Sequence, residues 1–174
     1  MSSVTSGRGP TTVRGKFADL FGLDLRSLAI FRVGLGLLLL GDLAIRAGDL
    51  SAHYTDQGVL PRSALTARHY VSLHFLDGTA DFQGALFVLA GLAALALLAG
   101  WRTRAATVVS WLLLMSLHAR NPMILQGGDA LLRLLLFWGM FLPLGARWSV
   151  DGLLRRGGGP AGGREVSAAS AALL

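Results

Sequence analysis

Residues 27–45 read SLAIFRVGLGLLLLGDLAI, and this stretch decides the fold class of the chain. As a helix rising ~1.5 Å per residue it would span about 28 Å, the thickness of one bilayer hydrocarbon core. It nevertheless carries Arg32 near one end and Asp42 near the other. Ionisable groups inside a membrane helix are costly, so each requires a partner, a water-filled cavity or a route to the interface. The stretch therefore predicts a membrane span whose two charges need an explanation.

The composition agrees with a membrane protein. Of the 174 residues, 53% are hydrophobic and only 15% are charged, whereas soluble domains carry roughly 25% charged residues. The net charge of +6 comes from basic residues that flank apolar segments, which favours anionic lipid as the partner over nucleic acid. The chain has no cysteine, which excludes disulfides, thiolate metal sites and cysteine catalysis.

Three further apolar runs follow the first and complete a predicted bundle. The four predicted spans are residues 27–45, 84–100, 103–118 and 130–145. A fifth begins at 166–174 and is too short to cross, which suggests a partial sequence. Residues 1–15 are predicted to be a disordered tail, and 16–26 and 63–76 to be short interfacial helices. The sequence thus predicts an all-α, polytopic transmembrane helix bundle over residues 16–174.

The distribution of basic residues predicts the orientation of this bundle. With four spans, ten basic residues share the side of the N-terminal tail, and four lie on the other side. Those four are Arg46, Arg62, Arg68 and Arg120. Because basic loops stay in the cytoplasm, the N-terminus is predicted to be cytoplasmic in a multi-pass protein of the plasma (inner) membrane.

Each charge within the spans has a predicted role. Arg32 is predicted to be an inner-side anchor whose long side chain reaches the interface. Asp42 and Arg133 would lie at similar depth near the outer side, so we expect them to pair, with Asp129 as a competing partner one turn from Arg133. The alternative for Arg133 is that it reaches the outer interface alone.

Small residues recur every seventh position along the first span. They are Ser27, Gly34, Gly41 and Gly48. Since small residues let membrane helices approach closely, this stripe predicts a helix-packing face.

Three motifs together resemble a known family. They are FRVGLGLLLLGDL at 31–43, YTDQGV at 54–59 with Arg62, and WSVDGL at 148–153. Their order and spacing resemble the membrane domain of the vitamin K-dependent γ-carboxylase superfamily, whose bacterial members are the HTTM (horizontally transferred transmembrane) proteins. The likeness covers about residues 24–174, corresponding to roughly the first half of that membrane domain.

The resemblance implies a quinone cofactor, but it does not carry over the carboxylase reaction. The family's carboxylases use a lysine in the loop after the third helix as the base. Here that loop, residues 118–129, contains no lysine, and Arg120 cannot act as a base because its pKa is too high. The only lysine of the chain, Lys16, is predicted to lie on the opposite side. We therefore expect no carboxylase activity.

His118 is the one candidate base that the sequence offers at this loop, although a lone interfacial histidine is commonly a hydrogen-bonding surface residue. No metal site is predicted, because His69 and His74 are five residues apart and a helical metal pair needs a spacing of four.

Three functions remain open from the sequence. The first is a membrane protein whose outer polar face binds a small molecule, a lipid or a partner peptide. The second is a membrane enzyme that acts on a quinone-like or lipid substrate, with His118 as base. The third is a structural or maturation partner of an exported protein or of another membrane chain. The residues of the predicted face are Asp42, Tyr54, Asp56, His118, Arg120, Asn121, Asp129 and Arg133.

Overall fold

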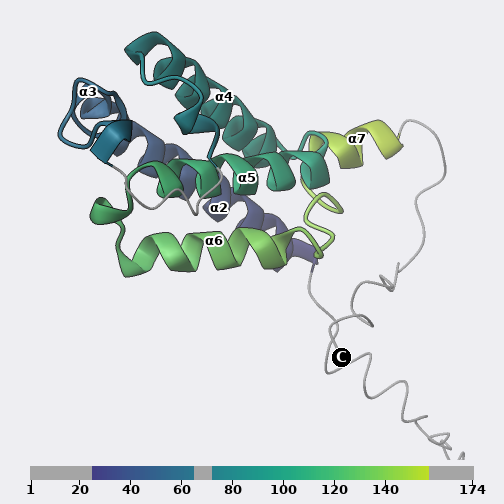
Figure 1. The fold of residues 1–174 in the computed structure, drawn as a ribbon. Coiled ribbons are helices and arrows are strands. Elements are labelled where there is room, and N and C mark those ends of the chain that lie inside the picture. Colours follow the sequence, from purple (N-terminus) through teal and green to yellow (C-terminus); the bar gives the residue numbers. More distant parts are fainter. Residues whose placement is uncertain (1–24, 65–71, 157–174) are drawn as a thin grey trace, which may run out of the picture.

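A computed structural model describes residues 25–64 and 72–156, and within these ranges the regular structure is helical (Figure 1). Four longer helices form the body of the molecule, and short helices connect them. In chain order the elements are α2 (Leu25–Gly48), α3 (Leu50–Tyr54), η1 (Arg62–Ala64), η2 (Leu73–Phe75), α4 (Ala80–Ala99), α5 (Thr103–Arg120), η3 (Pro122–Ile124), α6 (Gly127–Gly139) and α7 (Val150–Arg156). The all-α prediction is confirmed for the described residues.

Two of these helices, α2 and α4, are long and apolar enough to cross a bilayer. Buried helices of soluble proteins can meet the same criteria of length and composition. The α2 helix extends past both ends of the predicted 27–45 span, and α4 begins at Ala80, ahead of the predicted 84.

The α6 helix is shorter than its predicted span over 130–145. With 13 residues it is roughly 20 Å long, which is less than a hydrocarbon core. It ends at Gly139, and turns follow through Pro143 to Ser149. Proline disfavours the helical conformation of the residue before it and lacks an N–H to donate, so the apolar run cannot continue as one helix.

Several predicted segments lie outside the described residues. They are the tail at 1–15, most of the interfacial helix at 16–26, the centre of the one at 63–76, and the start of a fifth span at 166–174. The described flanks of the 63–76 segment form the short 3₁₀ turns η1 and η2.

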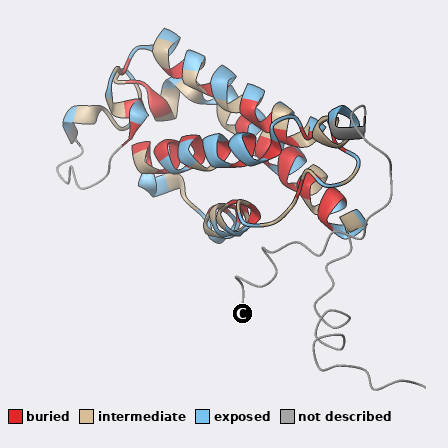
Figure 2. Ribbon diagram, turned by 90° about the vertical axis from the view of Figure 1, so that its right-hand side faces the viewer, coloured by how far each residue is buried: buried red, intermediate tan, exposed pale blue. Residues whose placement is uncertain are grey.

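The hydrophobic core lies where α2, α4, α5 and α6 meet. Its centre contains Leu35, Leu97, Leu114 and Leu136, one from each helix, all nearly inaccessible to solvent. Figure 2 shows the buried residues on the faces that these helices turn towards one another. Large apolar side chains also point outward, such as Leu38 of α2, which is 58% exposed. An apolar exterior of this kind fits contact with lipid or with another protein.

A close approach between α2 and α4 involves a glycine outside the predicted stripe. A Cβ atom at Gly36 would lie 2.9 Å from Cβ of Leu98, so only glycine lets α2 and α4 meet there. The predicted packing role of the stripe is wrong within the described part of the chain. A Cβ atom at Gly34, Gly41 or Gly48 would have no neighbour within 4 Å.

Arg32 fixes one end of the helical body, here called the α7 end. Its side chain is 1% exposed and donates hydrogen bonds to the carbonyl oxygens of Leu144, at 3.4 Å, and Trp148, at 2.6 Å. The prediction that Arg32 reaches outward to an interface is therefore wrong. Its Nη1 and Nη2 groups are satisfied by the turn after α6, where Trp148 has a φ of 48°, while its Nε has no hydrogen-bond partner among the described residues.

The WSVDGL motif has a structural role at the same end. Both carboxylate oxygens of Asp151 accept hydrogen bonds from the first residues of α5, at 2.8 Å from the backbone nitrogens of Arg102 and Thr103. A carboxylate at a helix N-terminus satisfies free N–H groups and complements the helix dipole. The motif thereby attaches α7 to the start of α5 (Figure 1).

Candidate functional site

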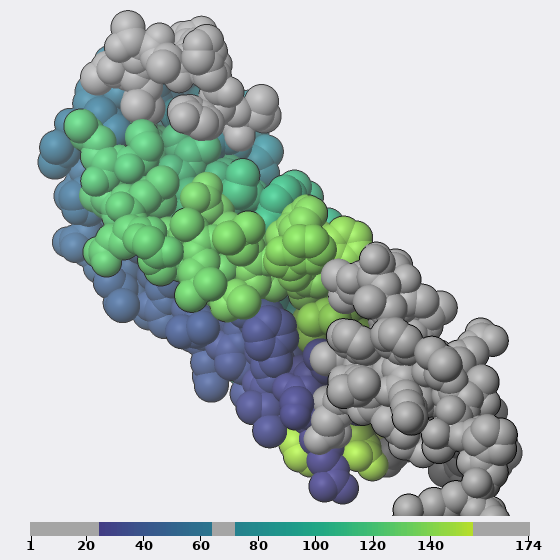
Figure 3. Space-filling view, turned by 90° about the horizontal axis from the view of Figure 1, so that it is seen from below, coloured from purple at the N-terminus to yellow at the C-terminus, as the bar shows by residue number. Residues whose placement is uncertain are grey.

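A cluster of charged side chains lies at the opposite end of the helical body, here called the α3 end. The end of α2, the end of α5 and the start of α6 meet there, and α2 and α6 are neighbours on the face shown in Figure 3. Nε of Arg46 lies 2.8 Å from Oδ1 of Asp42, and its Nη2 lies 2.6 Å from Oδ1 of Asp129. Nη1 of Arg46 donates to the Tyr54 hydroxyl at 3.0 Å. One guanidinium thus connects three elements.

Local sequence explains how each member reaches the cluster. Asp42 and Arg46 are four residues apart on α2, so they lie on the same helix face. Asp129 is in the first turn of α6, where its Oδ2 accepts a hydrogen bond from the backbone N–H of Gln126 at 2.7 Å. This capping interaction holds the Asp129 carboxylate in place while its Oδ1 faces Arg46.

His118 completes the cluster from the last turns of α5. Its side chain is 1% exposed, and its Nε2 lies 3.7 Å from Oδ1 of Asp129. Within the part of the chain that the structure describes, neither ring nitrogen has a hydrogen-bond partner. Buried polar atoms are rarely left in this state, so the imidazole requires an explanation. We refer to Asp42, Arg46, Tyr54, His118 and Asp129 as the α3-end cluster.

The predicted Asp42–Arg133 pair is wrong. Asp42 pairs with Arg46 of its own helix, and Asp129 also takes Arg46. Nη1 of Arg133 instead lies 3.9 Å from the sulfur of Met115. The prediction rested on a similar expected depth for Asp42 and Arg133. It fails because the two side chains leave their helices, α2 and α6, in different directions and reach different partners.

Arg120 organises the loop after α3. It is fully buried and donates to the carbonyl oxygens of Leu60 at 2.9 Å and Thr55 at 3.2 Å, and its Nη2 is 3.7 Å from Oδ1 of Asp56. The Asp56 carboxylate also pairs with Arg62 at 2.6 Å. Hydrogen bonding to Arg62 holds the pKa of the Asp56 carboxyl below its ordinary value.

The YTDQGV motif is therefore a folded turn in this protein. Besides the Asp56 contacts, the Thr55 hydroxyl donates to the Ser51 carbonyl at 2.6 Å, and the Val59 N–H donates to the Ala52 carbonyl at 2.8 Å. Asn121 contributes from η3, since its Nδ2 donates to the His53 carbonyl at 3.2 Å. These side chains hold the loop against α5, and their polar groups are largely occupied.

His74, for which the sequence predicted no metal-binding role, is a further buried histidine. Its Nδ1 hydrogen bonds with Oε1 of Gln83, and both side chains are nearly inaccessible. Burial lowers the pKa of His74, so the ring is neutral at neutral pH. The Ser72 hydroxyl, 2.6 Å from the Ser116 carbonyl, ties this segment to α5.

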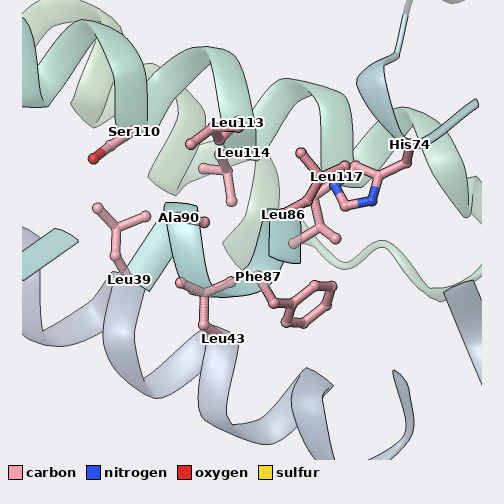
Figure 4. A pocket seen from close by; sticks show the side chains of 10 residues that line it. All are labelled: Leu39, Leu43, His74, Leu86, Phe87, Ala90, Ser110, Leu113, Leu114 and Leu117. Carbon is pink, nitrogen blue, oxygen red and sulfur yellow. The ribbon is translucent and has the colours of Figure 1, made fainter. Parts of the chain in front are cut away.

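An apolar cavity lies beside the α3-end cluster (Figure 4). Leucines of α2 and α5 face each other across it, Phe87 and Ala90 of α4 form another wall, and His74 closes one side. The full lining is Leu39, Leu43, His74, Leu86, Phe87, Ala90, Ser110, Leu113, Leu114 and Leu117. The Tyr54 ring packs edge-on against Phe87, with centroids 5.3 Å apart, so a residue of the cluster contacts a residue that lines the cavity.

Four of the eight residues of the predicted polar face meet in the cluster: Asp42, Tyr54, His118 and Asp129. Asp56, Arg120 and Asn121 hold the adjacent loop, and Arg133 lies apart. The central residue, Arg46, was missed as a site residue because its position just beyond the apolar run made it a loop charge. Its spacing of four from Asp42 was the available signal.

Comparisons with protein-family models, with curated proteins and with solved structures find no match. The fold and the cluster alone therefore define the class: an all-helical protein with two candidate membrane helices and a buried charged centre at one end.

Proposed function

We propose that this chain is an integral membrane protein, of the HTTM type that its motifs resemble, which binds a small amphipathic molecule or lipid at the α3 end. The proposal keeps the predicted orientation, with a cytoplasmic N-terminus and the α3 end on the outer side of the plasma membrane. The polar part of the ligand meets the α3-end cluster. Its apolar part packs against the side chains that line the neighbouring cavity, a space of about 20 Å³ that has to widen to admit it.

One observation carries the proposal: Tyr54 of the buried charged cluster packs against Phe87, which lines an apolar cavity. Binding sites for small molecules combine apolar walls with a few convergent polar groups in this way. Burial raises the pKa of the Tyr54 hydroxyl, so it stays protonated and can donate to a ligand.

The test measures the lipid and quinone that remain bound to the full chain after purification in detergent. Ala90→Phe fills the cavity, and Arg46→Met removes the central charge of the cluster. Each substitution should lower the bound amount by more than about tenfold, the equivalent of 1.4 kcal/mol. Leu92→Phe is the matched control, since Leu92 lies on the same helix but is 58% exposed. Unchanged binding in both test variants would refute the proposal.

A second function is favoured by the unpartnered imidazole of His118. As an enzyme acting on a quinone-like or lipid substrate, the protein would use His118 as a general base, with Asp129 orienting and stabilising the protonated ring. Quinone-dependent oxygen uptake that His118→Ala abolishes would establish this activity. Absence of uptake in the wild-type chain would exclude it.

A further inference from the structure

The α3-end cluster contains three side chains of the kinds that bind metal ions. Ligand atoms of Asp42, His118 and Asp129 all lie within 4.8 Å of one another. The three residues come from three different helices, α2, α5 and α6, so the tertiary fold creates the group. No spacing in the sequence indicates it.

His118 supplies an independent observation that points to a ligand. Its imidazole is 1% exposed, faces Oδ1 of Asp129 at 3.7 Å, and has no hydrogen-bond partner for either nitrogen among the described residues. A neutral imidazole with a free lone pair is the commonest metal ligand in proteins. The separation of 3.7 Å is near the roughly 3.4 Å between two ligands of a tetrahedral Zn²⁺ with bonds of about 2.1 Å.

The α3-end cluster has a net negative charge that a bound cation can neutralise. Two carboxylates and the Arg46 guanidinium sum to minus one when His118 is neutral, and a buried net charge is costly. A divalent cation with one hydroxide or other anionic ligand brings the sum to zero. Arg46 uses one lone pair of each carboxylate oxygen that it contacts, and a second remains on each.

We propose that Asp42, His118 and Asp129 bind a divalent transition-metal cation such as Zn²⁺. Mixed imidazole and carboxylate ligands suit this class of ion, whereas Ca²⁺ and Mg²⁺ prefer oxygen ligands alone. Three protein ligands leave a fourth position open for water or for a group of the bound molecule. The three ligand atoms, which lie within 4.8 Å of one another, draw closer together when the ion binds, since ligands of a tetrahedral Zn²⁺ are roughly 3.4 Å apart. The inference extends the proposed function, because it places the cation at the polar end of the same site.

The test uses the full chain in detergent micelles, titrated with ZnCl₂ and, for a spectroscopic signature, CoCl₂. We expect one equivalent bound per chain and a visible Co²⁺ absorption typical of low coordination number. His118→Ala and Asp129→Asn should each weaken Zn²⁺ binding by more than about 100-fold. His53→Ala is the matched control, because this histidine lies on the adjacent α3 and outside the group of three.

Two further variants distinguish a ligand from a residue that only supports the fold. His118→Cys should retain metal and shift its preference towards Cd²⁺, since thiolate is a softer ligand. Arg46→Gln should tighten Zn²⁺ binding by tenfold or more, because it removes a competing positive charge. No stoichiometric binding by the wild type, or binding that His118→Ala leaves unchanged, would overturn the proposal. Zn²⁺ binding and Co²⁺ absorption are measured independently of lipid or quinone retention. Failure of the metal site and failure of the proposed function are therefore distinguishable.

Discussion

At the scale of single residues, two buried arginines hold turns of the main chain, although Arg32 was expected to reach a membrane interface. Arg32 and Arg120 lie at opposite ends of the helical body, and both donate to main-chain carbonyls of distant turns. An arginine offers five N–H donors in a planar fork, which suits it to hold several carbonyls at once. In this protein the two residues fix loops to helices.

Arg120→Met should therefore destabilise the protein. The substitution leaves the carbonyls of Leu60 and Thr55 without their donor and removes a charge near Asp56. We expect a loss of about 2–4 kcal/mol, measured as a lower thermal midpoint of the helical circular-dichroism signal. Arg133→Met serves as the control and should change stability by less than about 0.5 kcal/mol. Equal effects of the two variants would contradict the role of Arg120.

The buried His74 predicts a dependence of stability on pH. Because burial lowers the pKa of His74 in the folded state, the unfolded chain takes up a proton first as the pH falls. The contribution of His74 to the free energy of unfolding is fully present above about pH 6.5. It is lost as the pH falls towards the folded pKa, by at most ~1.4 kcal/mol per pH unit.

The measurement compares thermal midpoints at pH 7.5 and pH 5.5. His74→Asn should flatten the decline between these two values, while His53→Asn should keep the wild-type slope. If the thermal midpoint of His74→Asn falls between pH 7.5 and pH 5.5 as steeply as that of the wild type, the pH dependence comes from other groups.

At the scale of elements, some glycines are required for helices and turns to pack closely, and others have open space around them. Gly100, at the turn between α4 and α5, has a φ of 73°, and a Cβ atom there would overlap the Arg32 side chain and Ser149. Gly34 lies on α2 with open space around its Cβ position.

Gly100→Ala should destabilise the protein by about 2 kcal/mol or more, since it combines a disfavoured backbone conformation with a steric clash. Gly34→Ala is its matched counterpart and should be neutral or stabilising by up to about 1 kcal/mol, because alanine is the better helix former. Thermal midpoints of the two variants provide the measurement. A larger loss for Gly34→Ala would restore the stripe as a packing face.

The helices themselves were largely predictable, and their ends and partners were not. Long apolar runs predict α2 and α4 because bilayer thickness and helix rise set the required length. The end of α6 was missed because hydrophobicity continues past Gly139, while Pro143 and the turn before it stop the helix. The Asp42–Arg133 pair failed because rotation about a helix axis depends on packing, which the hydrophobic pattern does not specify.

The candidate site could be predicted only in part, for a related reason. The polar residues of the two loops were identified, but sequence could not separate Asp129 and His118, which enter the cluster, from Asn121 and Arg120, which hold the loop. Arg46 is central only because the tertiary fold places Asp129 of α6 beside it, a contact that the sequence does not indicate.

For the whole molecule, the central claim is that α2 and α4 cross the membrane and place the α3-end cluster on the outer side. The chain has no cysteine, so single cysteines can be introduced and labelled in intact cells with a membrane-impermeant maleimide. Gln57 is an exposed residue of the loop between α2 and α4, and Arg102 is an exposed residue of the turn between α4 and α5. We predict that Gln57→Cys is labelled from outside and that Arg102→Cys is labelled only after the cells are permeabilised. Labelling of both residues from the same side, or release of the protein from membranes by alkaline carbonate, would contradict it.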